Sequence, residues 1–322
     1  MAQTLFHGRQ AHRIENSDLA VVVSVEGGHI AAIVDKPSRI NPLWVPPWPS
    51  IEPSRYTAAK HPEYGEGAEA KLLCGILGHN LCLDYFGPPS AEEAAAGLAT
   101  HGEASVLPYR IVSKVDALRA ELTLPQARIH FTRELRLDGR KLHFVETVEN
   151  LSALDRPIGW TQHVTLGPPF LENGVTEFRA PSVKSEDFAM GHVELARFSN
   201  AAASGGFSTH LMDPAREQAW FVAFSPHHKL ALGYAWKRKD FPWLGTWEEN
   251  RSRKHAPWLG RALTRGMEFG VSPFPETRRE MVTRGSLFGE PGYRWLPARA
   301  KLRAEYFAFL VPAERADLAI PV

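Results

Sequence analysis

The chain has 322 residues, of which 44% are hydrophobic and 23% are charged, and this composition is typical of a soluble globular protein with a sizeable core. Its 37 lysines and arginines against 36 aspartates and glutamates leave a formal net charge of +1, so no global field would draw it to nucleic acid or to an anionic membrane. The sequence has no continuous apolar span of the kind a membrane helix needs, and the N-terminal residues lack the apolar core of a secretory signal. We therefore expect a cytoplasmic protein with neither nucleic acid nor a membrane as partner.

Cysteines and tryptophans give two further indications. Cys74 and Cys82 are the only cysteines, and their spacing fits neither a zinc pair nor a redox pair, so we predict two buried small side chains. Several of the nine tryptophans stand beside polar residues, and aromatic faces with a polar edge suit sugar rings. These tryptophans are Trp44, Trp48, Trp160, Trp243, Trp247 and Trp258.

The first predicted elements are a hairpin, a loop and a helix. Residues 19–25 and 29–34 are apolar runs joined by Glu26-Gly27-Gly28, which predicts a β-hairpin. Residues 41–54 are rich in proline and tryptophan and predict an ordered loop. Residues 90–97, SAEEAAAG, predict a short helix, because Ser90 and Glu93 can form a capping box.

After this helix, strand patterns follow one another. In residues 127–137 the apolar positions Ile129, Phe131 and Leu135 share one parity, which predicts a strand with one buried face. The other predicted strands are residues 106–114, 118–124, 141–148, 158–166, 219–224, 230–236, 263–271 and 304–311. No fixed repeat or low-complexity linker divides the chain. We therefore predict an all-β fold, a large antiparallel β-sandwich with one short helix, forming a single domain over residues 1–322.

Glu268 is the first candidate for a functional side chain. It is the one carboxylate in the apolar run Thr264 to Pro275, TRGMEFGVSPFP. A buried ionised carboxylate is costly, so such a residue is normally paired, protonated or functional. The structural alternative is an ion pair with Arg261 or Arg265.

Three short motifs resemble the aldose 1-epimerase family, the galactose mutarotases. In FVETVENLSALDRPIGWTQHVTLGPPFL, residues 144–171, a strand ends in an Asn-containing turn and the next strand presents His163. Thr100-His101-Gly102 resembles the family's first His-Gly pair, with the strand that follows it expected at residues 103–109. Gly266-Met267-Glu268-Phe269 resembles the strand of the catalytic carboxylate. The motifs occur in the family's order.

The resemblance implies a galactose mutarotase-like supersandwich that interconverts the anomers of a small-molecule sugar. It implies Glu268 as general base, His163 as general acid, and His101 as a residue that binds the sugar and holds the open-chain carbonyl. Asn80 stands where the family has an Arg-Asn element, and Trp247 and Glu248 lie near the position of a ring-contacting Asp. The resemblance requires no metal and no cofactor.

The reaction itself asks for these residue types. Anomers interconvert by ring opening, in which a base removes the proton of the anomeric hydroxyl while an acid protonates the ring oxygen. An imidazole titrates near neutral pH, and burial can raise the pKa of a carboxyl group toward that range. We expect His101, His163 and Glu268 to line one cleft, with carboxylate and imidazole on opposite sides of the bound ring.

Two other classes of function remain open. His101 and Glu103, at alternate positions of a strand, could share a metal with His163 and Glu268 in a metal-dependent sugar isomerase or lyase. The chain could also be a carbohydrate-binding protein without activity. The sugar and the oligomeric state are left open by the sequence.

Overall fold

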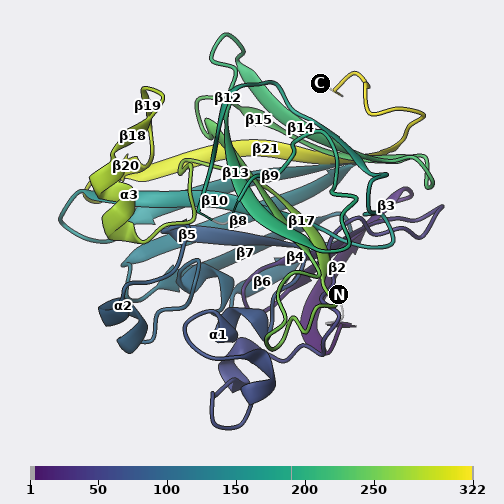
Figure 1. The fold of residues 1–322 in the computed structure, drawn as a ribbon. Helices are drawn as coiled ribbons and strands as arrows, with labels where there is room; N and C mark the ends of the chain where they lie inside the picture. Colours follow the sequence, from purple (N-terminus) through teal and green to yellow (C-terminus); the bar gives the residue numbers. More distant parts are fainter. Residues whose placement is uncertain (1–3, 190, 321–322) are drawn as a thin grey trace.

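The computed structural model describes residues 4–189 and 191–320, and their strands form two large antiparallel sheets that pack as two layers (Figure 1). In spatial order, the eleven-stranded sheet comprises β1 (Thr4–Phe6), β2 (Arg9–Glu15), β3 (Leu19–Ser24), β4 (Ile30–Asp35), β5 (His79–Asp84), β10 (Arg156–Leu166), β17 (Leu263–Gly270), β16 (Trp243–Asn250), β13 (Ser204–Met212) and β12 (Ser182–Asp187), with β20 (Arg294–Leu296) paired to β10. The prediction of an all-β antiparallel sandwich is confirmed.

The second layer is an eight-stranded sheet. In spatial order it comprises β11 (Glu177–Arg179), β14 (Gln218–Ser225), β15 (Leu230–Lys237), β21 (Lys301–Pro312), β9 (Lys141–Asn150), β8 (Ile129–Asp138), β7 (Ala117–Leu124) and β6 (Arg110–Ser113). The short strands β18 (Ser286–Leu287) and β19 (Glu290–Pro291) form a separate hairpin.

The alternating pattern in residues 127–137 is confirmed in β8. Ile129, Phe131 and Leu135 are buried, and the residues between them are more exposed. Arg133 shares the buried face because its Nε lies 2.7 Å from Oε1 of Glu146 on β9, so that both charges are paired. The hairpin predicted around Glu26-Gly27-Gly28 is also confirmed, as β3 and β4.

The prediction of one helix is incomplete. The expected helix is α2 (Ala91–Ala95), with the capping box between Ser90 and Glu93. The described residues contain two more α-helices, α1 (Ala70–Leu73) and α3 (Arg278–Arg284), and three 3₁₀ turns at Pro53–Arg55, Pro62–Tyr64 and Glu103–Ser105. None of the helices in the described ranges is long and apolar enough to cross a membrane.

The strand expected at residues 103–109 is wrong. Glu103–Ser105 forms a 3₁₀ turn after Gly102, which has a φ of 83°. The Glu103 carboxylate accepts hydrogen bonds from the backbone N–H groups of Gln126 and Ala127. This anchors the turn to the loop before β8.

The eleven-stranded sheet is covered by apolar residues on both faces. Its inner face packs on the eight-stranded sheet, in a core that includes Leu81, Val164 and Phe269. Its outer face carries a second cluster built largely from loops, with Trp44, Trp48, Leu72, Leu73, Cys74, Ile76, Cys82, Phe207, Trp247 and Trp258 among its members. The predicted loop at residues 41–54 is thus ordered by its tryptophans, and both cysteines are buried, free and part of this cluster. The candidate site lies between the sheet and these loops.

Candidate active site

Three of the candidate residues form one row across the eleven-stranded sheet. Asn80 on β5 is the cross-strand partner of His163 on β10, and His163 is the partner of Glu268 on β17. Directly paired residues of antiparallel strands point to the same face of a sheet. All three side chains therefore lie on the outer face, toward the loops.

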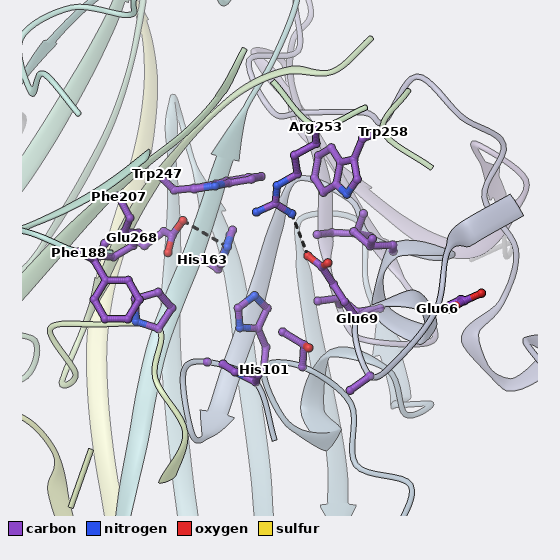
Figure 2. Close-up of a pocket in the computed structure, with 18 residues that line it drawn as sticks. Glu66, Glu69, His101, His163, Phe188, Phe207, Trp247, Arg253, Trp258 and Glu268 are labelled. Carbon is purple, nitrogen blue, oxygen red and sulfur yellow. Dashed lines mark hydrogen bonds and ion pairs between the residues drawn. The ribbon is translucent and has the colours of Figure 1, made fainter. Parts of the chain in front are cut away.

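A cavity of about 480 Å³ opens on this face. His101, His163, Glu268 and Trp247 all line it, as Figure 2 shows. The other lining residues are Glu66, Ala68, Glu69, Leu72, Leu73, Ile76, Gly87, Pro88, Thr100, Phe188, Phe207, Arg253, Trp258 and Pro275. As expected from the sequence, His101, His163 and Glu268 line one cleft.

His163 and Glu268 are in direct contact. Nε2 of His163 lies 3.2 Å from Oε1 of Glu268, and the two side chains are only 7% and 2% exposed. No hydrogen bond of good geometry joins them, so Oε1 is a buried oxygen without a hydrogen-bond partner in the described chain. Nδ1 of His163 lies 2.9 Å from the Thr165 hydroxyl, which fixes the orientation of the ring.

This contact corrects one expectation. A separation of 3.2 Å leaves no room for a sugar ring between Glu268 and His163. Both groups face the cavity from adjacent strands of one sheet, so a bound sugar would lie over the pair, with carboxylate and imidazole on the same side of the ring.

Burial shifts the pKa values of both groups. It raises the pKa of the Glu268 carboxyl well above its usual value of 4.5, and the positive charge of Arg265 offsets only part of this rise. Burial, followed by the proximity of His101, lowers the pKa of His163 well below 6.5. Both shifts favour the uncharged forms, so a single proton shared by the pair would reside on Glu268.

His101 lies beside this pair. Its ring centre is 5.0 Å from that of His163, and its Nδ1 donates to the carbonyl oxygen of Phe86. Burial lowers the pKa of His101 to about 4 despite that hydrogen bond. Because a carbonyl can only accept, the neutral ring carries its proton on Nδ1 and leaves Nε2 as an acceptor.

Aromatic side chains form much of the remaining wall. The ring of Trp247 meets His163 edge to face at a centroid distance of 5.9 Å. Trp258 also lines the cavity, and Trp44 and Trp48 pack against it from behind. Two of the six tryptophans noted in the sequence are thus placed to contact a ligand ring.

Two expected site residues are not brought to the cavity. Consecutive residues of a strand face opposite sides of a sheet, so Glu248, which follows the cavity-lining Trp247, points its carboxylate to the inner side. There Arg265 Nη1 donates to this carboxylate at 3.3 Å, and the Ser204 hydroxyl also donates to it. Asn80 is fully buried beside His163 and does not line the cavity, although its Nδ2 has no hydrogen-bond partner among the described residues. Arg265, the alternative ion-pair partner of Glu268, instead forms an ion pair with Glu248.

The geometric basis of the metal alternative is not found. Glu103 is in a 3₁₀ turn and its carboxylate is bound by backbone N–H groups, so it does not share a strand face with His101. Over residues 4–189 and 191–320, no group of three or more His, Cys, Asp or Glu side chains is arranged to hold a metal ion.

Sequence reasoning missed Arg253 and Glu69. Arg253 lines the cavity, where its Nη1 lies 3.1 Å from Oε1 of Glu69. Its guanidinium lies over the Trp258 ring at 4.7 Å. In the sequence Arg253 stands between Trp247 and Trp258, and this position could have indicated a role in the site. Glu69 stands in a charged stretch that contains no such indication.

Comparison with known proteins supports the fold. No family model matches the chain, and no curated protein matches it in sequence. A solved structure from Klebsiella pneumoniae, named "putative aldose 1-epimerase", has a TM-score of 0.75 at 15% identity and covers 97% of this chain and 83% of its own.

Two further solved structures agree. A galactose mutarotase related enzyme from Lactobacillus acidophilus has a TM-score of 0.62 at 13% identity, covering 96% of this chain and 100% of its own. A galactose mutarotase-like protein from Clostridium acetobutylicum has a TM-score of 0.64 at 11% identity, covering 97% and 98%. The chain therefore has the galactose mutarotase-like fold, and the resemblance to these proteins is confirmed at the level of the fold.

Proposed function

We propose that this chain is an isomerase of the aldose 1-epimerase type, which interconverts the anomers of a sugar by acid–base ring opening. The observation that carries the proposal is the contact between His163 and Glu268, 3.2 Å apart on neighbouring strands, at the floor of a cavity with aromatic walls. The fold adds support, because solved structures that share it bear the names of epimerases and mutarotases.

The pair supplies both catalytic groups from one proton. Moving that proton from Glu268 to His163 gives a carboxylate base and an imidazolium acid. A sugar hydroxyl that donates to the unpartnered Oε1 of Glu268 would favour this charged form, because a hydrogen bond to a carboxylate stabilises it. Binding of the substrate would thus activate the base.

The ring then opens and closes without a cofactor. Glu268 takes the proton of the anomeric hydroxyl, His163 gives its proton to the ring oxygen, and the bond between that oxygen and the anomeric carbon breaks as a carbonyl forms. After rotation about the first carbon–carbon bond, the ring oxygen adds to the other face of the carbonyl. The two protons return by the same path, so each group ends as it began.

His101 would hold the reacting end of the sugar. Its unprotonated Nε2 can accept a hydrogen bond from a sugar hydroxyl next to the reacting carbon. Trp247 would stack on the sugar or cover it. The proposal treats residues 1–322 as one domain, in keeping with a hydrophobic core that draws on both large sheets from Ile14 to Leu310.

NMR measurement of anomer exchange on a panel of aldoses tests this proposal. Exchange faster than the spontaneous rate supports it. Sugar binding without acceleration would favour a carbohydrate-binding protein, and activity that appears only with an added divalent metal would favour a metal-dependent isomerase or lyase.

A further inference from the structure

Arg253 is the only lysine or arginine among the described residues that line the cavity. It follows β16 in the chain and reaches the cavity between two carboxylates. Its Nη1 lies 3.1 Å from Oε1 of Glu69, and its Nε lies 3.6 Å from Oε2 of Glu249. Figure 2 shows Arg253 and Glu69 joined to the right of the Glu268–His163 pair.

The guanidinium is also held by aromatic rings. It lies 4.7 Å from the centre of the Trp258 ring and 5.6 Å from that of Trp247. Such cation–π contacts help to fix the plane of the group. In the part of the chain that the structure describes, no residue accepts a hydrogen bond from Nη2 of Arg253, so donors remain for a ligand.

Among the described residues that line the cavity, acidic side chains outnumber basic ones. Glu66 and Glu69 line it, and Glu249 is buried against Arg253 from behind. Burial lowers the pKa values of His101 and His163 and raises that of Glu268, and each shift favours the uncharged form of the group. Two carboxylates, those of Glu69 and Glu249, therefore lie against the one guanidinium.

From this arrangement we propose that Glu69 and Arg253 select the charge of the substrate, so that the site accepts neutral sugars and disfavours phosphorylated or acidic ones. This inference rests on the proposed function, because it concerns the substrate class of the same site. A neutral sugar can accept hydrogen bonds from the free N–H groups of Arg253 while Glu69 stays in place. An anionic sugar must displace Glu69 from Arg253 and also approach Glu66.

We expect a moderate difference in kcat/KM between neutral and anionic sugars. The Arg253 and Glu69 side chains are 24% and 40% exposed, and solvent weakens a pair at such a position. The selection should also weaken as salt is added, since screening reduces interactions between exposed charges.

The test compares a neutral aldose with its 6-phosphate and its uronic acid on wild type and Glu69→Gln. Wild type should give a higher kcat/KM for the neutral sugar. Glu69→Gln should raise the ratio of anionic to neutral kcat/KM about fivefold, since the charge of Arg253 is then less compensated. Glu63→Gln is the matched control, because it removes the same charge from an exposed residue that does not line the cavity.

A second variant tests Arg253 itself. Arg253→Gln should raise KM for the neutral sugar about tenfold with a smaller effect on kcat, as expected for a group that binds but does not react. Wild type that prefers the anionic sugar, or a ratio unchanged by Glu69→Gln, would overturn the inference.

Failure of the proposed function would look different. No sugar would then show accelerated anomer exchange, whatever its charge. The charge selection would still be measured, from dissociation constants of the same sugars determined by the change in the protein's tryptophan fluorescence, to which Trp247 and Trp258 in the cavity wall contribute.

Discussion

Gly266 leaves the space that the carboxylate of Glu268 occupies. The two residues lie two positions apart on β17 and so face the same side of the sheet. A Cβ atom at residue 266 would overlap Oε1 of Glu268. The absence of a side chain at residue 266 thus allows the carboxylate to lie beside His163.

Gly266→Ala should therefore displace the carboxylate and reduce activity. Misplacing a reacting group by about 1 Å can cost about 100-fold in rate, so we expect a fall in kcat/KM of that order. Gly292→Ala is the control, since the nearest atom to its added Cβ would be Pro273 Cδ at 3.4 Å. Anomer exchange and thermal unfolding, measured together, separate lost positioning from lost folding, and full activity in Gly266→Ala would contradict the assignment of Glu268.

Thr165→Val should affect turnover more than binding. The substitution keeps the shape of the side chain but removes the hydroxyl that lies 2.9 Å from Nδ1 of His163. The ring would then lose the contact that fixes its orientation, and we expect kcat to fall about tenfold with KM nearly unchanged. Thr165→Ser retains the hydroxyl and should restore most of the activity. Equal rates and pH profiles for Val, Ser and wild type would show that Thr165 does not position His163.

The rate of anomer exchange should be high over a broad pH range between an acid limb set by His163 and an alkaline limb set by Glu268. Activity needs one proton on the pair. As pH falls, a second proton binds with the lowered pKa of His163, so activity should persist below pH 6.5 before it declines. As pH rises, the single proton is lost with the raised pKa of Glu268, so the alkaline decline should come well above pH 4.5. A profile of kcat/KM against pH, corrected for the spontaneous rate, checks both limbs; an acid limb at 6.5 would argue against the buried pair.

Glu268→Gln should stabilise the protein increasingly as pH rises. In the unfolded chain Glu268 loses its proton near pH 4.5, whereas in the folded chain its pKa is raised. Between these two values the folded state binds more protons, so wild-type stability falls as pH rises, and a neutral amide avoids this loss.

Each unit of pKa difference corresponds to about 1.4 kcal/mol, or roughly 2 °C in Tm for a chain of this size. Thermal unfolding of both proteins at pH 4 and pH 8 measures the effect. Two results would contradict this prediction: a Glu268→Gln variant less stable than wild type at pH 8, or the same difference in Tm between the two proteins at pH 4 and pH 8. Either result would mean that burial does not raise the pKa of Glu268.

The strands and one helix could be read from local sequence because their signals are local. The parity of Ile129, Phe131 and Leu135 defines β8, and the Ser90–Glu93 capping box defines α2. The same reasoning could have found α3, since Thr277 and Glu280 form an equivalent capping box. Few residues of α3 are apolar, so its sequence has no periodic hydrophobic pattern.

The site was predictable only in part. His101, His163 and Glu268 reach one cavity, as the order of their motifs suggested. Trp247 and Glu248 were both expected there, but consecutive residues of a strand face opposite sides, so only one could reach it. Arg253 and Glu69 meet through loops about 180 positions apart in the chain, and no local pattern encodes such a contact.

Anomer exchange in wild type and Glu268→Gln, followed by NMR on a neutral aldose, tests the central claim most directly. The substitution keeps the size of the side chain and removes its ability to accept a proton, and general acid–base groups contribute about 10²- to 10⁴-fold in rate. We predict accelerated exchange by wild type, loss of that acceleration in Glu268→Gln, and retained sugar binding in both. Exchange that is equally fast in the two proteins, or absent from both, would contradict the account.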